Sequence, residues 1–158
     1  MTPPDIAAQA AHIEATFAHI AATRMAGVPV LNPALGVALR GFQAHGAYHL
    51  GVLVTPWFMN LIAFATAEEA PTRVGDKAML VLPSGAYEAI RGHEAALGAY
   101  WAVSLFSPMG DFADMDTAIA TADAALAEFL AAPEPAPAPK PQPPVSRRAL
   151  FGLRGDAA

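Results

Sequence analysis

The stretch Leu50-Gly51-Val52-Leu53-Val54-Thr55-Pro56-Trp57-Phe58-Met59-Asn60-Leu61-Ile62-Ala63-Phe64 decides the fold of this 158-residue chain. It is almost unbroken apolar sequence, and its β-branched and aromatic side chains favour strands. Because proline cannot donate a hydrogen bond to a sheet, Thr55-Pro56 is expected at a strand end or a bulge. We therefore predict two buried strands joined at Thr55-Pro56.

Three large side chains, those of Trp57, Phe58 and Met59, follow the proline directly. Large apolar residues mostly pack in a core. The same residue types also hold apolar partners on peptide-binding surfaces, methionine because its side chain adapts its shape. Asn60 adds a polar group in apolar surroundings. Both interpretations, core and binding surface, stay open on these residues alone.

The composition and the histidine spacing exclude several kinds of chemistry. The chain has no cysteine, which rules out disulfides, thiolate metal sites, iron–sulfur clusters and a cysteine nucleophile. His12 and His19 share a helical face, but no third ligand is nearby in the sequence. His93-Glu94 lacks the second histidine of a zinc protease motif, because position 97 is Leu97. We predict no catalytic residues, no metal site and no cofactor.

The net charge of −5 is unevenly distributed along the chain. From Pro133 onward four basic residues outnumber two acidic ones, so this part carries +2 and the rest, by subtraction from −5, carries −7. An acidic body argues against nucleic-acid binding, which needs a basic surface. No apolar run approaches the roughly 20 residues that span a bilayer, and the N-terminus lacks an export signal. We expect a cytoplasmic protein with no stable membrane insertion.

The periodicity of the sequence predicts an α+β fold in one domain. Apolar residues at helical spacing indicate a helix over about residues 3–25 and another that ends near residue 132. Between them, turn residues separate strands expected at 36–42, 48–54, 57–64, 77–82, 86–91 and 97–106. This order favours a mainly antiparallel sheet with an N-terminal and a C-terminal helix packed on one of its faces.

The end of the chain differs in composition from the rest. Prolines alternate with small or polar residues over 133–145, which favours an extended linker after a folded domain of residues 1–132. The tail, residues 146–158, contains the run Ser146-Arg147-Arg148-Ala149-Leu150-Phe151. This run is similar to the motif of twin-arginine export signals, but no long apolar region follows it. A disordered tail without a role is the alternative.

Three stretches follow one another in an order typical of one protein family: Pro29–Leu35, Gly51–Leu61 and Ser104–Met109. Together they resemble the nickel-iron hydrogenase assembly chaperones of the HybE/HupJ family, over roughly Ala22 to Leu130. The resemblance implies a non-catalytic, cytoplasmic maturation protein. It also implies that the protein acts on the hydrogenase small subunit, which carries a twin-arginine export signal.

The resemblance leads us to expect that the chain binds the small-subunit precursor or its signal peptide. Two apolar segments each place a proline, a large aromatic residue and a methionine together, and we expect them to form one groove. The expected groove residues are Trp57, Phe58, Met59, Asn60, Phe106 and Met109. Acidic residues would meet the paired arginines of the signal.

The tail is expected to act as an internal pseudo-substrate of that groove. The tail residues that copy the signal are Arg147, Arg148, Leu150 and Phe151. Exchange of tails between two copies would give a homodimer. Two other functions stay open: a scaffold that recruits other hydrogenase maturation proteins, and a small-molecule-binding protein that uses the same aromatic residues.

Overall fold

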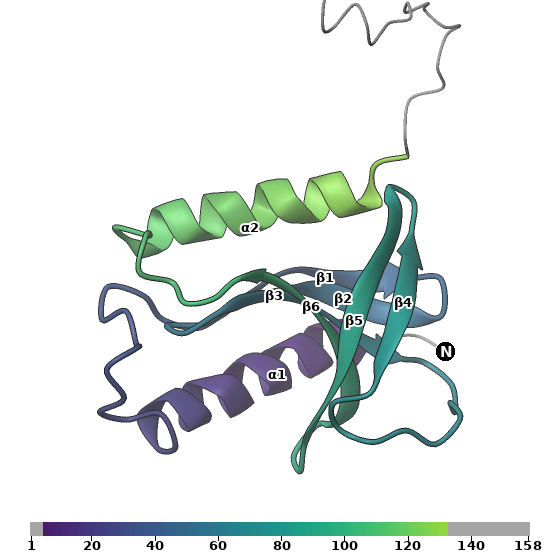
Figure 1. Cartoon of the computed structure of the whole chain (residues 1–158), viewed down its shortest axis with the longest axis horizontal. Helices are drawn as coiled ribbons and strands as arrows, with labels where there is room; N and C mark the ends of the chain where they lie inside the picture. Colours follow the sequence, from purple (N-terminus) through teal and green to yellow (C-terminus); the bar gives the residue numbers. More distant parts are fainter. Residues whose placement is uncertain (1–4, 133–158) are drawn as a thin grey trace, which may run out of the picture.

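The chain folds as a six-stranded antiparallel sheet with a helix on each face (Figure 1). The computed structural model describes residues 5–132. In chain order the elements are α1 (Asp5–Ala22), β1 (Ala38–His45), β2 (Tyr48–Val54), β3 (Met59–Ala65), β4 (Lys77–Leu82), β5 (Gly85–Glu94), β6 (Gly98–Phe106) and α2 (Met115–Leu130). The α+β class predicted from the sequence is confirmed.

The strands are arranged in the order β1-β2-β3-β6-β5-β4, and every neighbouring pair is antiparallel. β6 lies beside β3, so residues 66–76 carry the chain from central β3 to the far edge, where β4 begins. Two backbone hydrogen bonds hold this connection: Gly75 N–H donates to Arg91 O at 2.9 Å, and Arg91 N–H donates to Asp76 O at 2.8 Å. β1 and β4 are the two edges of the sheet.

The buried side chains form one cluster on each face of the sheet, and each helix belongs to one of them. The expectation of two helices on one face is therefore wrong, because Figure 1 shows α2 above the sheet and α1 below it. Leu53 and Ile62 pack in the α1-side cluster, whereas Val52 and Leu61 pack in the α2-side cluster. β2 and β3 are thus buried on both faces, which is why their sequence is almost continuously apolar.

The element bounds lie within a few residues of those predicted. β1 continues to His45 because the hairpin turn comes later than expected, at Gly46, whose φ of 60° suits glycine. α1 ends at Ala22 rather than near residue 25, since the following residues form turns. α2 begins after Asp114, whose carboxylate accepts a hydrogen bond from Thr117 N–H at 2.8 Å.

Some predicted features lie outside the described part of the chain. These are the start of the first helix near residue 3, the linker of residues 133–145 and the tail of residues 146–158. Within residues 5–132, no helix is long and apolar enough to cross a membrane.

Candidate functional site

The bend between β2 and β3 is closed by the buried side chain of Thr55. Its Oγ1 accepts hydrogen bonds from Phe58 N–H at 2.9 Å and Trp57 N–H at 3.2 Å, and it donates to Phe58 O at 3.1 Å. Thr55 N–H also donates to Phe58 O, at 2.9 Å. These bonds fix Trp57 and Phe58 in a tight turn between the strands, as the sequence predicted from Thr55-Pro56.

The structure does not place the six expected groove residues in one groove. Trp57 and Phe58 are half-buried on the α1 side, where the Phe58 ring lies 6.1 Å from the Phe17 ring. Met59 and Met109 are fully buried in the α2-side cluster. Phe106 is 41% exposed, and its ring packs edge-on against Phe112 of the α2-side cluster, with 5.1 Å between centroids.

The expected groove is therefore divided by the sheet. A Met59 or Met109 side chain with no exposed surface contributes packing in this conformation rather than contact area. Trp57, Phe58 and Phe106 retain exposed surface. That these residues contact a partner stays a prediction.

Asn32 joins the three sequence stretches on which the family resemblance is based. Its backbone N–H donates to Pro56 O at 2.9 Å. Its side-chain Nδ2 donates to Met109 O at 2.9 Å and to Phe112 O at 2.8 Å, and its Oδ1 accepts from Ala34 N–H. Asn32 thus ties the 28–35 connection to the β2–β3 bend through its backbone and to the loop before α2 through its side chain.

Asn60 lies on the α1 side of β3, directly opposite Ser104 of β6. Its Oδ1 is buried and has no hydrogen-bond partner among the described residues. A buried acceptor without a donor costs free energy, so a bound backbone N–H or a water molecule at this position would stabilise the site. The Oδ1 of this amide is therefore unsatisfied but covered, and its role in binding stays a prediction.

The α1 side of the sheet is uncovered over β4 and β5. The α1-side cluster contains residues of β1, β2, β3 and β6 and none of β4 or β5. Side chains alternate between faces along a strand. We call the exposed α1-side residues of the two strands the open face: Lys77, Met79 (59% exposed), Val81 (75%), Ala86, Glu88 and Ile90 (44%). Exposed apolar patches of this kind mark interaction sites more often than single exposed residues do.

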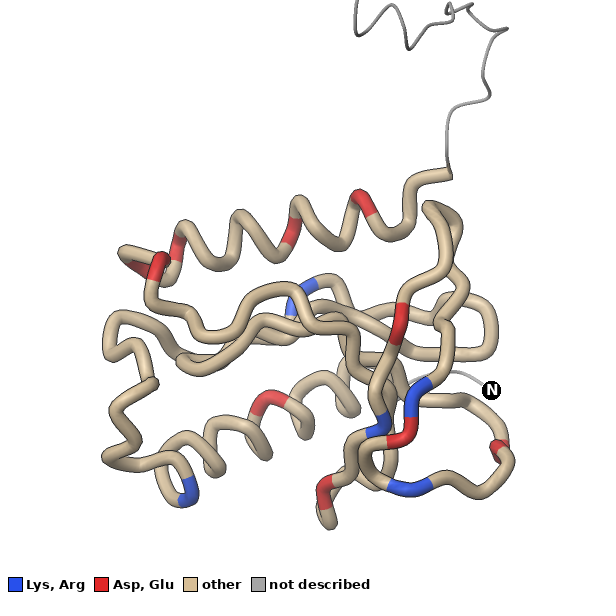
Figure 2. Tube along the Cα trace, in the orientation of Figure 1, with Lys and Arg blue, Asp and Glu red and all other residues tan. Residues whose placement is uncertain are grey.

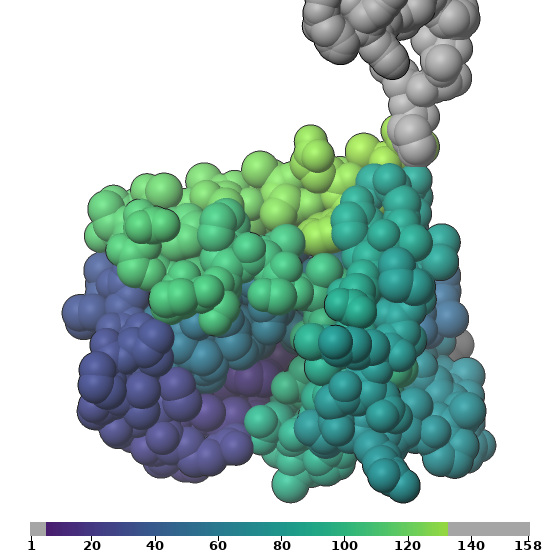
Figure 3. Space-filling model, in the orientation of Figure 1, coloured from purple at the N-terminus to yellow at the C-terminus, as the bar shows by residue number. Residues whose placement is uncertain are grey.

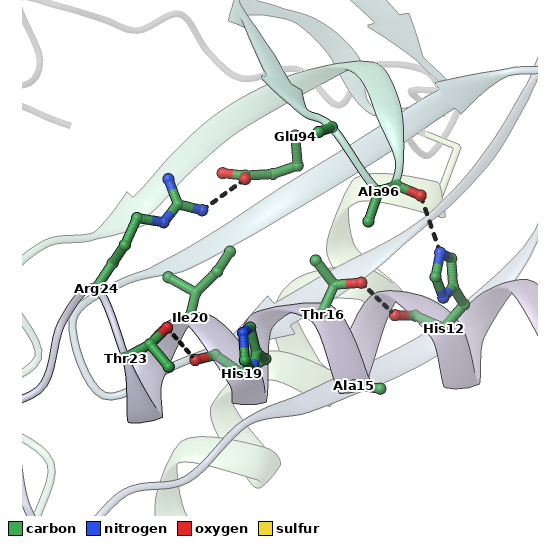
Figure 4. A pocket seen from close by; sticks show the side chains of 10 residues that line it. His12, Ala15, Thr16, His19, Ile20, Thr23, Arg24, Glu94 and Ala96 are labelled. Atoms are coloured by element: carbon green, nitrogen blue, oxygen red, sulfur yellow. Dashed lines mark hydrogen bonds and ion pairs between the residues drawn. The ribbon is translucent and has the colours of Figure 1, made fainter.

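A groove of about 520 Å³ lies between α1 and the β5–β6 turn. Figure 3 shows the surface hollowed where α1 meets the β5–β6 hairpin, and Figure 4 shows the lining residues. Arg24 Nη2 bonds Glu94 Oε1 at 2.6 Å, and His12 Nε2 lies 2.9 Å from Ala96 O. The groove thus contains the Arg24–Glu94 ion pair and a His12 imidazole that is hydrogen-bonded to the backbone.

The groove adjoins the open face along β5. Glu94, Gly92, Ile90 and Glu88 are alternate residues and so point to the same side of the strand. The Tyr100 ring lies across Gly92, where a Cβ would meet the ring at 2.7 Å. Burial raises the pKa of the Tyr100 hydroxyl, and the nearby Glu94 carboxylate adds to this rise in pKa.

His12 and His19 both line the groove, as their predicted shared helical face required. Among residues 5–132 no three histidine, cysteine or acidic side chains come close enough to hold a metal ion. The groove itself was not predicted, because it depends on where the β5–β6 turn sits against α1. Nothing in the local sequence encodes that contact.

A buried ion pair on the α2 side was also not predicted. Arg91 is 7% exposed, its Nη2 donates to Glu69 Oε1 at 2.7 Å, and its guanidinium lies 4.5 Å from the Trp101 ring centroid. Trp101 Nε1 donates to Glu69 Oε2 at 3.1 Å. The sequence contained a signal for the burial of Arg91, because Arg91 is two residues after Ala89 in β5 and so lies on the same, inward-facing side of the strand. The position of Glu69, in the 66–76 connection, was not readable from the sequence.

Carboxylates dominate the charged side chains of the described residues (Figure 2). Three ion pairs form there: Arg24–Glu94, Arg40–Asp123 and Arg91–Glu69. Glu88 and Lys77, both in the open face, take part in none of them. An unpaired carboxylate beside exposed apolar side chains is suited to a partner with both basic and apolar groups.

These features define a class of protein: an α+β domain with one part of its sheet face uncovered and apolar. Comparison with known proteins identifies the family. The chain belongs to the family described as "[NiFe]-hydrogenase assembly, chaperone, HybE", whose model matches residues 8–153. Its family role is therefore in the assembly of nickel-iron hydrogenases.

The curated relatives carry names that agree with this role. The chain is 46% identical over 141 residues to the "Hydrogenase expression/formation protein HoxT" of Azotobacter vinelandii, covering 87% of this chain and 92% of the relative. It is 49% identical over 131 residues to the "Hydrogenase expression/formation protein HupT" of Azotobacter chroococcum, covering 82% and 85%. The solution structure of HybE from Escherichia coli has the same fold, with a TM-score of 0.64, 24% identity, and coverage of 94% and 91%.

Proposed function

We propose that this chaperone binds the small-subunit precursor of a nickel-iron hydrogenase through its twin-arginine signal peptide, in the cytoplasm, before export. The open face is the proposed binding site. The observation that carries the proposal is the exposure of Met79, Val81 and Ile90 on a sheet face that α1 leaves uncovered. The chaperone holds its client and catalyses no reaction.

The chemistry of the open face matches that of the proposed ligand. A twin-arginine signal offers paired guanidinium groups next to apolar side chains. Glu88 lies directly opposite Met79 in the β4–β5 pairing, so a carboxylate and apolar surface are adjacent. The body as a whole carries −7, which favours the approach of a basic peptide.

The residues predicted from the sequence lie on β3 and β6 and at the β2–β3 bend, on the side of the open face nearest the centre of the sheet. Asn60 and Ser104 form the row next to Ile62 and Ala102. In the proposal the buried Asn60 Oδ1 accepts a backbone N–H of the peptide only after the side chains that cover it move aside. Trp57 and Phe58 supply partly exposed aromatic surface on the α1 side, next to the start of β3. Phe106 packs on the α2 side against Phe112, so it lies outside the open face. In the proposal Met59 and Met109 support these residues by packing in the α2-side cluster, on the other face of the sheet.

The first experiment compares two forms of the client. Purified chain is titrated with small-subunit precursor that has its signal peptide and with the same subunit lacking it, and affinity is measured by calorimetry. The proposal predicts binding of the full precursor and at least a tenfold loss without the signal. Equal affinity for both forms would contradict it and would favour recognition of the folded subunit body.

A further inference from the structure

We propose that the tail segment Ser146–Leu153 docks along β4 of its own chain, over Met79 and Val81. The site is an edge strand whose outer backbone groups are free. β4 pairs with β5 at every residue from Lys77 to Leu82 without a bulge. Among the described residues, no backbone hydrogen bond other than those of this pairing involves the six residues of β4.

The opposite edge of the sheet is protected, which makes β4 the available one. β1 is interrupted by a bulge between Arg40 and Gln43. Leu39 N–H of β1 donates to the Glu14 carboxylate of α1 at 2.7 Å. Bulges and covering elements are common devices that prevent an edge from accepting another strand. β4 has neither, and its Val81 is 75% exposed.

The chain leaves the described domain beside β4. Ser84, in the β4–β5 turn, donates from its Oγ to Phe129 O at 2.9 Å and from its N–H to the same oxygen at 3.3 Å. These bonds fix the C-terminal end of α2 next to the end of β4, as Figure 1 shows. The described chain therefore ends, at residue 132, close to the β4–β5 turn.

The length of the intervening chain allows the contact. Thirteen residues, 133–145, span about 40 Å at roughly 3.1 Å per residue in a polyproline conformation. The six residues of β4 extend about 20 Å. The tail segment can therefore reach any position along β4.

The composition of the tail matches the open face. Leu150 and Phe151 can cover Met79 and Val81. Arg147 and Arg148 are complementary to the −7 body and to Glu88, opposite Met79, and must lie away from Lys77 at the start of β4. The family match extends to residue 153, so the family domain includes this segment. Extended segments that add to a sheet edge gain main-chain hydrogen bonds and side-chain pockets together.

Docking of the tail would regulate access to the open face, a consequence that rests on the function proposed above. A tethered segment has a local concentration on the order of 1 mM. With a segment affinity on the order of 0.1 mM, the tail weakens apparent signal-peptide binding by about tenfold. The docking itself does not depend on that function.

The docking is tested by paramagnetic labelling of the full chain. Because the chain has no cysteine, Gly152→Cys introduces a single site for a spin label. The proposal predicts that backbone amide signals of β4 and β5 broaden far more than those of β1. Uniform broadening of all amide signals, or broadening centred on the groove between α1 and the β5–β6 turn, would overturn the proposal.

Two double variants provide the specificity control. Arg147→Ala with Arg148→Ala removes two cations inside the segment, and Lys140→Ala with Arg154→Ala removes two outside it. The first is expected to abolish the selective broadening and the second to preserve it. Equal effects of the two variants would show a charge effect without docking and would overturn the proposal. Broadening found only between mixed labelled copies would instead show exchange between chains.

Signal-peptide affinity separates a failure of this proposal from a failure of the function. If the peptide binds and Arg147→Ala with Arg148→Ala raises its affinity about tenfold, both proposals stand. If the peptide binds equally to both chains and β4 is not broadened, only the tail proposal fails. If β4 is broadened but no signal peptide binds, only the proposed function fails.

Discussion

Asn32 shows how one residue can join three distant parts of the sequence through its backbone and its side chain. Its amide bonds reach the loop before α2, and its backbone bonds to the β2–β3 bend. The orientation of the amide is fixed by these bonds, because Oδ1 must face the Ala34 N–H donor. The bend that carries Trp57 and Phe58 is therefore positioned by a residue more than twenty positions away.

Replacing Asn32 is expected to destabilise the domain. Asn32→Asp keeps the acceptor for Ala34 but turns a carboxylate toward two carbonyl oxygens, so two hydrogen bonds are lost. We predict that the free energy of unfolding falls by about 2 kcal/mol at neutral pH, measured by urea denaturation. Asn32→Ala should lose a similar amount. Unchanged stability in both variants would mean that this junction contributes nothing.

At the residue scale, the sequence predicted the chemistry of the bend better than its orientation. Thr55-Pro56 correctly indicated the end of β2, and Asn60 correctly indicated a polar group among apolar ones. The division of the aromatic and methionine residues between two faces was not predicted. It depends on the alternation of β3 and on the bulge between β3 and β6, whose register is a tertiary feature.

At the scale of elements, α2 is tied to the sheet edge by a pair of charged side chains. Arg40 of β1 donates to both carboxylate oxygens of Asp123, at 2.9 and 3.0 Å. The hydrogen bonds from Arg40 lower the pKa of Asp123. The backbone N–H of Thr117 likewise lowers the pKa of Asp114 at the start of the helix.

The lowered pKa of Asp123 predicts a dependence of stability on pH. A carboxylate with a depressed folded-state pKa stabilises the fold above its unfolded-state pKa, and this contribution disappears as the pH falls through the folded value. Because the pair is exposed, its contribution is below about 1 kcal/mol. Asp123→Asn should therefore lower Tm at pH 6, and this difference in Tm should shrink as the pH falls below the unfolded-state pKa of about 3.9.

The matched control for this titration is Asp116→Asn in the same helix. Asp116 forms none of the ion pairs or side-chain hydrogen bonds among the described residues. It should not reproduce the pH-dependent difference between wild type and Asp123→Asn. A constant Tm difference across the whole pH range for Asp123→Asn would contradict the role of the ion pair.

At the scale of the whole molecule, the sequence predicted the elements and missed the arrangement of the two helices. The strongest signal for helices on both faces was the nearly continuous apolar run of residues 50–64. Strands of a sheet with one solvent-exposed face alternate apolar and polar residues instead. Applied strictly, this rule requires cover on both faces of β2 and β3. The weaker alternation in β4 and β5, with Met79 and Val81 exposed, shows where the cover ends.

In the proposed function the open face is the place where the chaperone holds its client. Helices cover β2 and β3 on both faces, which stabilises the centre of the sheet, and leave β4 and β5 bare on one face. A chaperone needs apolar surface that a client can reach without unfolding the chaperone itself. Val81 and Met79 meet that requirement, because they lie on an exposed edge strand rather than in either core cluster.

The most direct test of this account replaces one exposed valine in the open face and one outside it. Val81 is 75% exposed in β4, and Val74 is 69% exposed in the 66–76 connection, so the two are matched in residue type and exposure. Val81→Lys and Val74→Lys are made in the Arg147→Ala, Arg148→Ala background, in which the tail does not compete.

The measurement is calorimetric affinity for a synthetic twin-arginine signal peptide. The account predicts that Val81→Lys weakens binding at least tenfold, about 1.4 kcal/mol, through lost apolar contact and added repulsion of the arginines. Val74→Lys should bind like the parent chain. If both folded variants bind the peptide as tightly as the parent, the open face is not the binding site and the central claim is contradicted.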